Sequence, residues 1–164
     1  MISVGIIDDH KVVVEGLEFL INQYDGIEVT AKAHSAAEGL QMLSQSEPDV
    51  LLLDVSLPDG NGIDLCKQIK SEHPNLKILM LTSYSEIGLV MRALENGASA
   101  YVLKTAMIEE VREGILALAS GERFFCDEAD VLMKRRSEPH PVRLSRRETE
   151  LLGHIVAGLS NSEI

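Results

Sequence analysis

The chain has 164 residues, with 15 Lys or Arg and 26 Asp or Glu side chains, and therefore a formal net charge of −11. Hydrophobic residues make up 45% and charged residues 25%, which excludes a disordered chain, a collagen-like repeat and a disulfide-rich miniprotein. No apolar run approaches the ~20 residues that a membrane span requires, and the acidic N-terminal segment lacks the positive charge of a signal peptide. We therefore expect a cytoplasmic protein with no membrane partner.

The charge is distributed unevenly along the chain. Residues 1–126 hold 9 basic and 19 acidic side chains, a net −10, whereas residues 127–164 hold 6 basic and 7 acidic ones. Within the second part, residues 134–150 carry 6 basic against 3 acidic side chains. An acidic domain joined to a basic segment indicates two functions in one chain.

Over the first 121 residues, short β-branched apolar runs alternate with stretches of helical spacing. The runs predict five strands, at residues 2–8, 27–33, 49–54, 77–82 and 100–103. Apolar residues at helical spacing follow each run, as Val13, Leu17 and Ile21 follow the first. Five strands that are each followed by a helix need crossover connections, so we expect an α/β fold with a doubly wound, five-stranded parallel sheet.

The remainder of the chain has a different organisation. Residues 122–143 are rich in Pro and basic residues and are typical of a linker, with a short helix over 127–136. Residues 144–164 hold the capping-box spacing S-x-x-E twice, starting at Ser145 and at Ser160, and this predicts two helix starts. Only a first turn of the second helix follows, so we expect the chain to stop inside a small all-α domain.

Polar residues stand where four of the five predicted strands end. Asp8 and Asp9 end the first strand, Asp54 the third and Thr82 the fourth, and Lys104 follows the fifth. Doubly wound sheets bind ligands at the carboxyl ends of their strands, so we expect these groups to share one rim. Three carboxylates would repel one another unless a cation were shared, and their hard oxygens suit Mg²⁺.

This set of residues predicts a site that accepts a phosphoryl group. Asp54 would be the nucleophile, the ammonium of Lys104 would neutralise charge on the phosphoryl oxygens, and the Thr82 hydroxyl would donate a hydrogen bond to one of them. Each residue alone has a structural alternative: Asp8 or Asp9 as a helix cap, Lys104 as a solvated side chain, and Thr82 as a β-branched strand end. Their joint order along the strands favours the functional interpretation.

Four ordered motifs carry a family resemblance. IIDDH, LLLDVSLPDGNG, LMLTS and GASAYVLKT resemble the receiver domain of bacterial two-component response regulators over residues 1–121. The ending LSRRETELLGHIVAGLSNSEI resembles the opening of a LuxR-type helix-turn-helix domain, so the whole chain is similar to the NarL/FixJ subfamily. The resemblance implies a flavodoxin-like receiver of strand order 2-1-3-4-5, a linker at 122–143 and an incomplete DNA-binding domain at 144–164.

The resemblance also implies roles for single residues and a set of partners. It implies a phosphoacceptor at Asp54, a Mg²⁺ site made by Asp8, Asp9, Asp54 and the backbone carbonyl of Ser56, phosphoryl contacts from Thr82 and Lys104, and an aromatic switch at Tyr101. A sensor histidine kinase would donate the phosphoryl group, and phosphorylation would control homodimerisation and DNA binding of the full-length protein. The present chain lacks a recognition helix and is expected to bind DNA weakly or not at all.

Two other functions compete with this one. A haloacid-dehalogenase-type phosphatase also uses a strand-end Asp with Mg²⁺, but it needs a second Asp two residues later as the general acid, and here Ser56 stands there. A receiver that acts only through protein partners is the other alternative. We expect a phosphoacceptor switch and not a turnover enzyme.

Several residues are expected to have no part in the site. The five histidines lack the spacing of zinc ligands and are interpreted as structural or surface residues. Cys66 and Cys126 form no CxxC pair, so both are expected as reduced thiols. Thr105 follows Lys104 where many receivers have a proline, and this leaves the isomer of the Lys104–Thr105 bond open.

Overall fold

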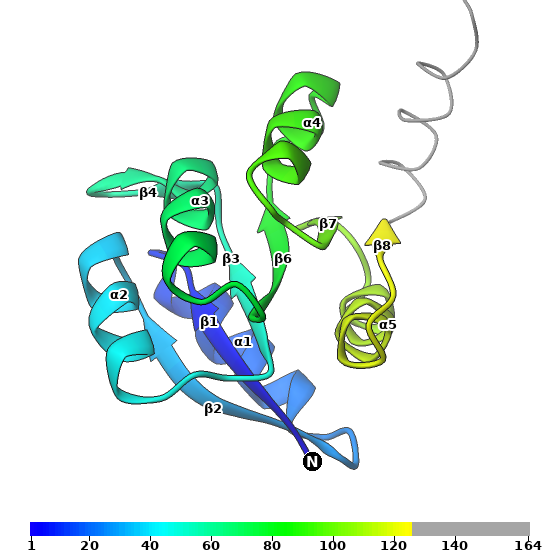
Figure 1. Ribbon diagram of the computed structural model, residues 1–164. Coiled ribbons are helices and arrows are strands. Elements are labelled where there is room, and N and C mark those ends of the chain that lie inside the picture. The colour runs from blue at the N-terminus through cyan, green and yellow to red at the C-terminus, as the bar shows by residue number, and fades with distance from the viewer. Residues whose placement is uncertain (126–164) are drawn as a thin grey trace, which may run out of the picture. The chain divides into compact units, whose positions relative to one another are not determined.

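The computed structural model describes residues 1–125, which form a parallel sheet with helices on both faces (Figure 1). The sheet strands are β1 (Ile2–Ile7), β2 (Ile27–Ala33), β3 (Val50–Leu53), β6 (Lys77–Thr82), β7 (Ala100–Leu103) and β8 (Phe124–Phe125), in the order β2-β1-β3-β6-β7-β8. The helices are α1 (Lys11–Ile21), α2 (Ala36–Gln45), α3 (Gly62–Glu72), α4 (Ile87–Glu95) and α5 (Ile108–Ala119). Helices α1 and α5 contact each other, as do α2 with α3 and α3 with α4, so the helices lie in two layers.

The predicted parallel α/β architecture and the order of the first five sheet strands are confirmed. The sheet has one strand more than the five predicted, because Phe124–Phe125, which we had placed in the linker, pair with β7 as β8. Two residues are too short a run to show a β period in the sequence. The short helix predicted over 127–136 and the helix starts predicted in 144–164 lie outside the described residues.

Burial explains why the central strands are uninterruptedly apolar. All four residues of β3 are at most 1% exposed, and β6 is buried from its second residue onward. A strand covered by helices on both faces has no solvent side, so its sequence does not alternate. Each fully buried Leu or Ile contributes roughly 1.5–3 kcal/mol relative to an exposed one. This core therefore fixes where β1, β3, β6 and β7 end, and with them the groups on the rim.

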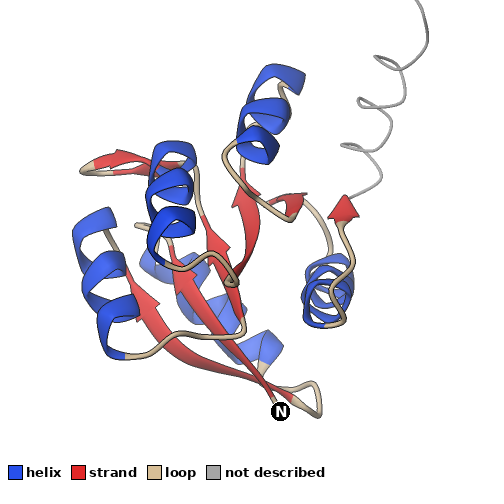
Figure 2. Ribbon diagram, in the orientation of Figure 1, coloured by secondary structure: helices blue, strands red, loops and turns tan. Residues whose placement is uncertain are grey.

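Two turns need a glycine because of their backbone conformation. Gly26 has a φ of 85° and Gly97 a φ of 96°, a region that side chains with a Cβ disfavour. Gly26 closes the turn between α1 and β2, and Gly97 ends α4. Figure 2 shows these connections as short loops between the helices and strands. Within residues 1–125, no helix is both long and apolar enough to span a bilayer.

Cys66 lies on α3 and is completely buried, with its thiol donating to the Asn96 carbonyl over 3.5 Å. Burial raises the pKa of this thiol to about 12, which lowers its thiolate fraction at pH 8 about a thousandfold relative to a free cysteine. In a Cys126→Ser chain, we expect iodoacetamide to leave Cys66 unmodified until guanidinium unfolds the protein. Mass spectrometry would check this, and modification of the native chain at the rate of free cysteine would contradict it.

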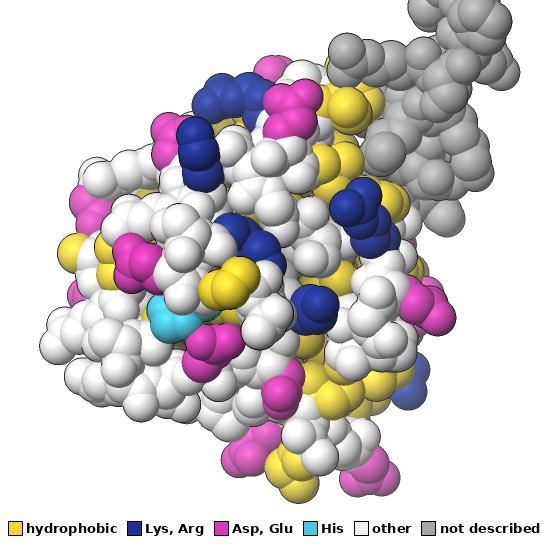
Figure 3. Space-filling view, in the orientation of Figure 1, with side chains coloured by type: hydrophobic (Ala, Val, Ile, Leu, Met, Phe, Trp, Pro, Cys, Tyr) yellow, Lys and Arg dark blue, Asp and Glu magenta, His cyan; other side chains and the backbone are white. Residues whose placement is uncertain are grey.

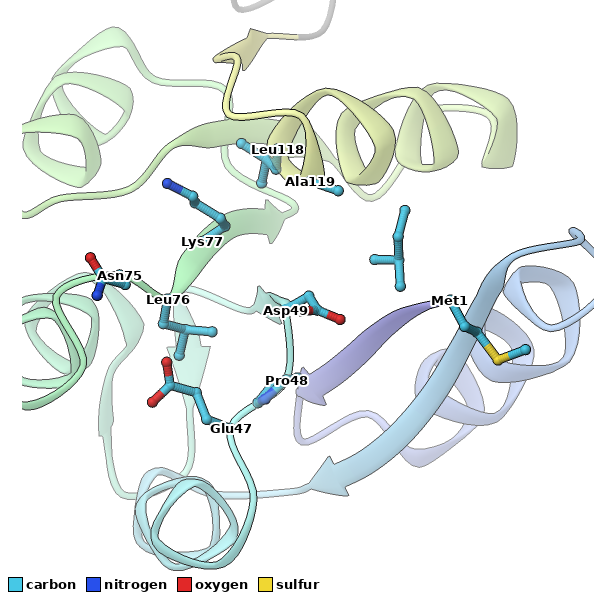
Figure 4. Close-up of a pocket in the computed structure, with 10 residues that line it drawn as sticks. Met1, Glu47, Pro48, Asp49, Asn75, Leu76, Lys77, Leu118 and Ala119 are labelled. Carbon is cyan, nitrogen blue, oxygen red and sulfur yellow. The ribbon is translucent and has the colours of Figure 1, made fainter.

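A cavity of about 450 Å³ opens at the amino ends of β1, β3 and β6 (Figure 4). Its one Asp side chain, Asp49, is already engaged, because Oδ2 accepts hydrogen bonds from the Ser3 amide at 2.8 Å and the Ser3 hydroxyl at 2.7 Å. These two bonds hold the pKa of Asp49 below its usual value, and the bond from the Ser3 amide has the larger effect. The carboxylate thus joins β1 to the start of β3, and the cavity lies at the opposite end of the strands from the polar rim predicted above.

Candidate functional site

Two aspartates end neighbouring strands and are both buried. Asp8 follows β1 and Asp54 follows β3, and the two strands pair up to Ile7 and Leu53. The amide of Asp54 continues the ladder by donating to the Ile7 carbonyl at 3.0 Å. Asp8 is 2% exposed and Asp54 is 3% exposed. A buried carboxylate needs hydrogen bonds or an opposite charge. Because two of them lie next to each other here and repel each other, we expect a positive charge nearby.

Lys104 supplies the nearest positive charge. Its Nζ lies 2.6 Å from Asp8 Oδ2 and 2.7 Å from Asp54 Oδ2, and therefore bridges the two carboxylates. The Lys104 amide donates to the Thr82 carbonyl at 2.8 Å, which fixes the loop after β7 against the end of β6. The structure thus brings together three of the predicted residues, which are separated by about 50 positions in sequence.

The pKa values of Asp54 and Lys104 reflect burial together with the contacts inside this trio. Burial raises the pKa of Asp54, the hydrogen bond and charge of Lys104 act in the opposite direction, and the negative charge of Asp8 adds to the rise. Burial alone would lower the pKa of Lys104, but the hydrogen bonds and charges of Asp54 and Asp8 together raise it. Lys104 is therefore held as an ammonium at neutral pH.

Asp9 and His10 complete the cluster. Ligand atoms of Asp8, Asp9, His10 and Asp54 all lie within 4.8 Å of one another, with His10 Nδ1 2.8 Å from Asp9 Oδ1. His10 is exposed, in agreement with its interpretation as a surface residue, and the structure adds that it lies beside these carboxylates. The alternative that Asp8 or Asp9 caps the first helix is wrong, because His10 is the N-cap of α1 and Asp8 Oδ1 accepts from the His10 amide at 2.9 Å.

The donor set fits a hard divalent cation. Three carboxylates and one ammonium leave an excess of negative charge at the rim, and two of the carboxylates are buried where water screens them poorly. Carboxylate oxygens are the ligands that Mg²⁺ prefers, usually with several waters retained. Ser56, whose carbonyl the sequence predicted as a further ligand, is the first residue of the hairpin strand β4 (Ser56–Leu57), only two residues after Asp54.

Thr82 lies next to the trio, since its carbonyl accepts from the Lys104 amide, and it is joined to Tyr101 through Tyr84. Thr82 is completely buried at the end of β6, and its Oγ1 accepts from the Tyr84 amide at 3.3 Å. Tyr101, in β7, is also completely buried, and its hydroxyl donates to the Tyr84 carbonyl at 2.6 Å. The described residues contain no cis peptide bond, so the Lys104–Thr105 bond is trans.

Gly62 is a further residue of the site that the sequence pattern does not indicate. It begins α3, and its amide donates to the Val55 carbonyl at 2.7 Å. A Cβ at this position would lie 1.8 Å from the backbone carbonyl oxygen of Asp54, a distance at which the backbone has to move. The glycine therefore allows the start of α3 to pack directly against Asp54.

Comparison with known proteins identifies the family of a chain that has these strand-end carboxylates, the bridging lysine and the buried Thr82. The family described as the response regulator receiver domain matches residues 4–116. The chain belongs to the response regulators. Among its relatives, response regulator protein VraR of Staphylococcus saprophyticus is 35% identical, over 99% of this chain and 79% of VraR.

Solved structures agree with the assignment of this response regulator. A LuxR-family two-component response regulator from Aurantimonas sp. superposes with a TM-score of 0.80 at 29% identity, over 84% of this chain and 99% of that one. RcsB from Salmonella enterica, solved bound to a promoter in the presence of the phosphomimetic BeF₃⁻, gives a TM-score of 0.77 at 28% identity, over 96% and 78%. As a two-component response regulator with LuxR-type relatives, the chain falls among transcription regulators.

Proposed function

We propose that this response regulator is a switch in which Asp54 accepts a phosphoryl group from a sensor histidine kinase. The observation that carries the proposal is the bridge of Lys104 Nζ between the buried carboxylates of Asp8 and Asp54. It supports the proposal because the carboxylate proposed as the nucleophile, a positive charge and the proposed cation ligands lie together at one strand-end rim. Positioning and charge neutralisation are the main requirements of phosphoryl transfer.

In the transfer step, a carboxylate oxygen of Asp54 attacks the phosphorus of the kinase phosphohistidine. An O–P bond forms, the P–N bond breaks, and the departing imidazole takes up a proton. Mg²⁺, held by Asp8, Asp9, Asp54 and the Ser56 carbonyl, would neutralise charge on the phosphoryl oxygens. Lys104 exchanges its bond with Asp54 Oδ2 for a bond to a phosphoryl oxygen and keeps its bond to Asp8.

Thr82, Tyr84 and Tyr101 form the second half of the proposed switch. In the phosphorylated state, the Thr82 hydroxyl donates to a phosphoryl oxygen on Asp54. As it turns toward that oxygen, it loses the hydrogen bond that it accepts from the Tyr84 amide in the present structure. Tyr84 is also held by the hydroxyl of Tyr101, which is completely buried. Phosphorylation would therefore act on the loop before α4 through a small number of existing hydrogen bonds.

The proposed output is homodimerisation and DNA binding in the cytoplasm. The RcsB neighbour was solved on promoter DNA, and a helix-turn-helix domain starting near residue 144 remains our prediction for residues outside the described part. On the receiver face in view, acidic and basic side chains are interspersed and form no basic stripe (Figure 3). A surface that tracks nucleic acid is instead rich in Lys and Arg. Because residues 1–126 carry a net charge of −10, we assign DNA contact to the segment beyond the receiver.

A phosphatase of the haloacid-dehalogenase type is less well supported. Such an enzyme needs a general acid two residues after the nucleophile, and Ser56 at that position is an exposed hairpin residue with no acidic side chain. We therefore propose a phosphoacceptor with at most slow self-dephosphorylation, and no turnover of a separate substrate.

The proposal is tested by incubating the chain with a small acyl phosphate and Mg²⁺ and measuring its intact mass. We expect the wild-type chain to gain one phosphoryl group and Asp54→Asn to gain none, because an amide is not a nucleophile of this kind. Asp25→Asn, an identical change at an exposed turn, is the matched control and should behave as wild type. No Mg²⁺-dependent gain in the wild type, or an undiminished gain in Asp54→Asn, would rule out the proposal.

A further inference from the structure

Asp59 lies at the tip of the hairpin that follows Asp54 and contacts a different helix. The hairpin consists of β4, labelled in Figure 1, and β5 (Gly60–Asn61). Asp59 is in the turn between the two strands. Its Oδ1 accepts from the Ala36 amide at 2.7 Å and its Oδ2 from the Ala37 amide at 2.9 Å. Both amides belong to the first turn of α2, so one carboxylate joins the hairpin to the start of that helix.

These two bonds satisfy amides that would otherwise lack a partner. The first amides of a helix have no intrahelical acceptor, and the N-cap Ser35 serves only the Glu38 amide, at 3.2 Å. A carboxylate is favoured there because the positive end of the helix dipole faces it. The Ala37 and Ala36 amides also hold the pKa of Asp59 below its usual value, so the bonds persist at neutral pH.

The start of α2 is also joined to the acidic site. Glu38 Oε2 accepts from the His34 amide at 2.7 Å, and His34 Nδ1 lies 3.0 Å from the backbone carbonyl of Asp8. The first turn of α2 therefore contacts the tip of the hairpin through Asp59. The same turn is connected to the backbone of Asp8 through His34. A movement of the hairpin relative to α2 is a movement relative to Asp8.

The base of the hairpin contacts Asp54, because the Ser56 amide donates a hydrogen bond to the Asp54 carboxylate. Ser56 pairs with Asn61, and the Gly62 amide donates to the Val55 carbonyl at 2.7 Å. Val55 and Leu57, on either side of Ser56, are buried in the core. Because a two-residue ladder is marginal on its own, the contacts at the tip add to what fixes Ser56.

We propose that Asp59 is a positioning residue that fixes the Ser56 segment against Asp8 and thereby sets the affinity of the site for Mg²⁺. The inference rests on the proposed function, since it concerns the cation site of that switch. Groups that orient metal ligands without touching the metal typically contribute ten- to a hundredfold to affinity. Asp59 is exposed and its bonds face water, so we expect the low end of this range, about tenfold.

The test is a titration of the ¹⁵N-labelled chain with Mg²⁺, followed by amide NMR shifts. We expect Asp59→Ala to raise the Kd about tenfold, and Asp59→Asn, which removes the same charge but keeps one acceptor oxygen, to raise it less. Asp25→Ala, which removes an exposed carboxylate in the turn before β2, should leave the Kd unchanged. At saturating Mg²⁺, phosphoryl uptake by Asp59→Ala should approach the wild-type rate.

The outcomes separate this inference from the proposed function. Equal Mg²⁺ affinities for wild type, Asp59→Ala and Asp59→Asn would overturn the positioning role alone. A lowered melting temperature with an unchanged Kd would also overturn the positioning role, because Asp59 would then only stabilise the start of α2. Absence of any Mg²⁺ binding by the wild-type chain would overturn the proposed site and this inference with it. If Asp59→Ala does not fold, the comparison of wild type with Asp59→Asn decides.

Discussion

Replacing Lys104 by methionine is expected to lower the free energy of unfolding by about 3 kcal/mol in EDTA and to suppress phosphoryl uptake. The change removes the ammonium that bridges Asp8 and Asp54 and leaves two buried carboxylates next to each other. Removing one partner of a buried ion pair typically lowers the free energy of unfolding by about 3–5 kcal/mol. We expect the lower value because Asp54, whose pKa is already raised by burial, can take up a proton.

Chemical denaturation of Lys104→Met, with and without Mg²⁺, measures this effect. A cation bound by the carboxylates would replace part of the missing charge, so Mg²⁺ should restore more stability to the variant than it adds to the wild type. The double variant Asp54→Asn/Lys104→Met should be less destabilised than Lys104→Met alone, because it no longer has two unpaired carboxylates. Full additivity of the two substitutions would show that the bridge has no energetic role.

Replacing Gly62 by alanine is expected to reduce phosphoryl uptake by about 100-fold although it removes no side chain of the site. The new Cβ would lie 1.8 Å from the Asp54 carbonyl oxygen and 3.0 Å from the Val55 Cα, so the Asp54 backbone has to shift. A misplacement of about 1 Å at a reacting group costs roughly 100-fold in rate. The strain should also lower the free energy of unfolding by about 1–3 kcal/mol, as other overpacking substitutions do.

Gly60→Ala is the matched control for this substitution. Gly60 lies in the same hairpin, has no positive φ and has open space where its Cβ would be. Rates of acyl-phosphate uptake at saturating Mg²⁺ for the two variants, with melting temperatures measured alongside, separate misplacement from unfolding. A Gly62→Ala chain that is folded and takes up the phosphoryl group as fast as Gly60→Ala would contradict the close packing of α3 on Asp54.

Most of the strand-end site could be predicted because strand ends are visible in the sequence. The apolar runs end in charged or polar residues, and the rule that parallel strands share a carboxyl edge places Asp8, Asp54 and Thr82 together. Lys104 was found for the same reason. The structure adds that Lys104 bridges both carboxylates and that burial raises the pKa of Asp54, neither of which a residue pattern contains.

The residues that sequence reasoning missed act through contacts between distant segments. His10 has no ligand spacing with another histidine, and it enters the cluster only because α1 starts beside the rim. Gly62 and Asp59 read as ordinary turn residues, since their partners, Asp54 and the start of α2, are set by tertiary packing. The strand β8 was missed because it has only two residues, and because its partner β7 is separated from it in sequence by α5.

The central claim is that a phosphoryl group is carried by the carboxylate of Asp54. Borohydride reduction of the chain after treatment with an acyl phosphate and Mg²⁺ tests it directly, since an aspartyl phosphate is reduced to homoserine at the modified position. Peptide mass spectrometry should find homoserine at position 54 only when Mg²⁺ is present. Homoserine at another aspartate, or a stable phosphate on a serine, threonine or histidine with position 54 unmodified, would contradict it.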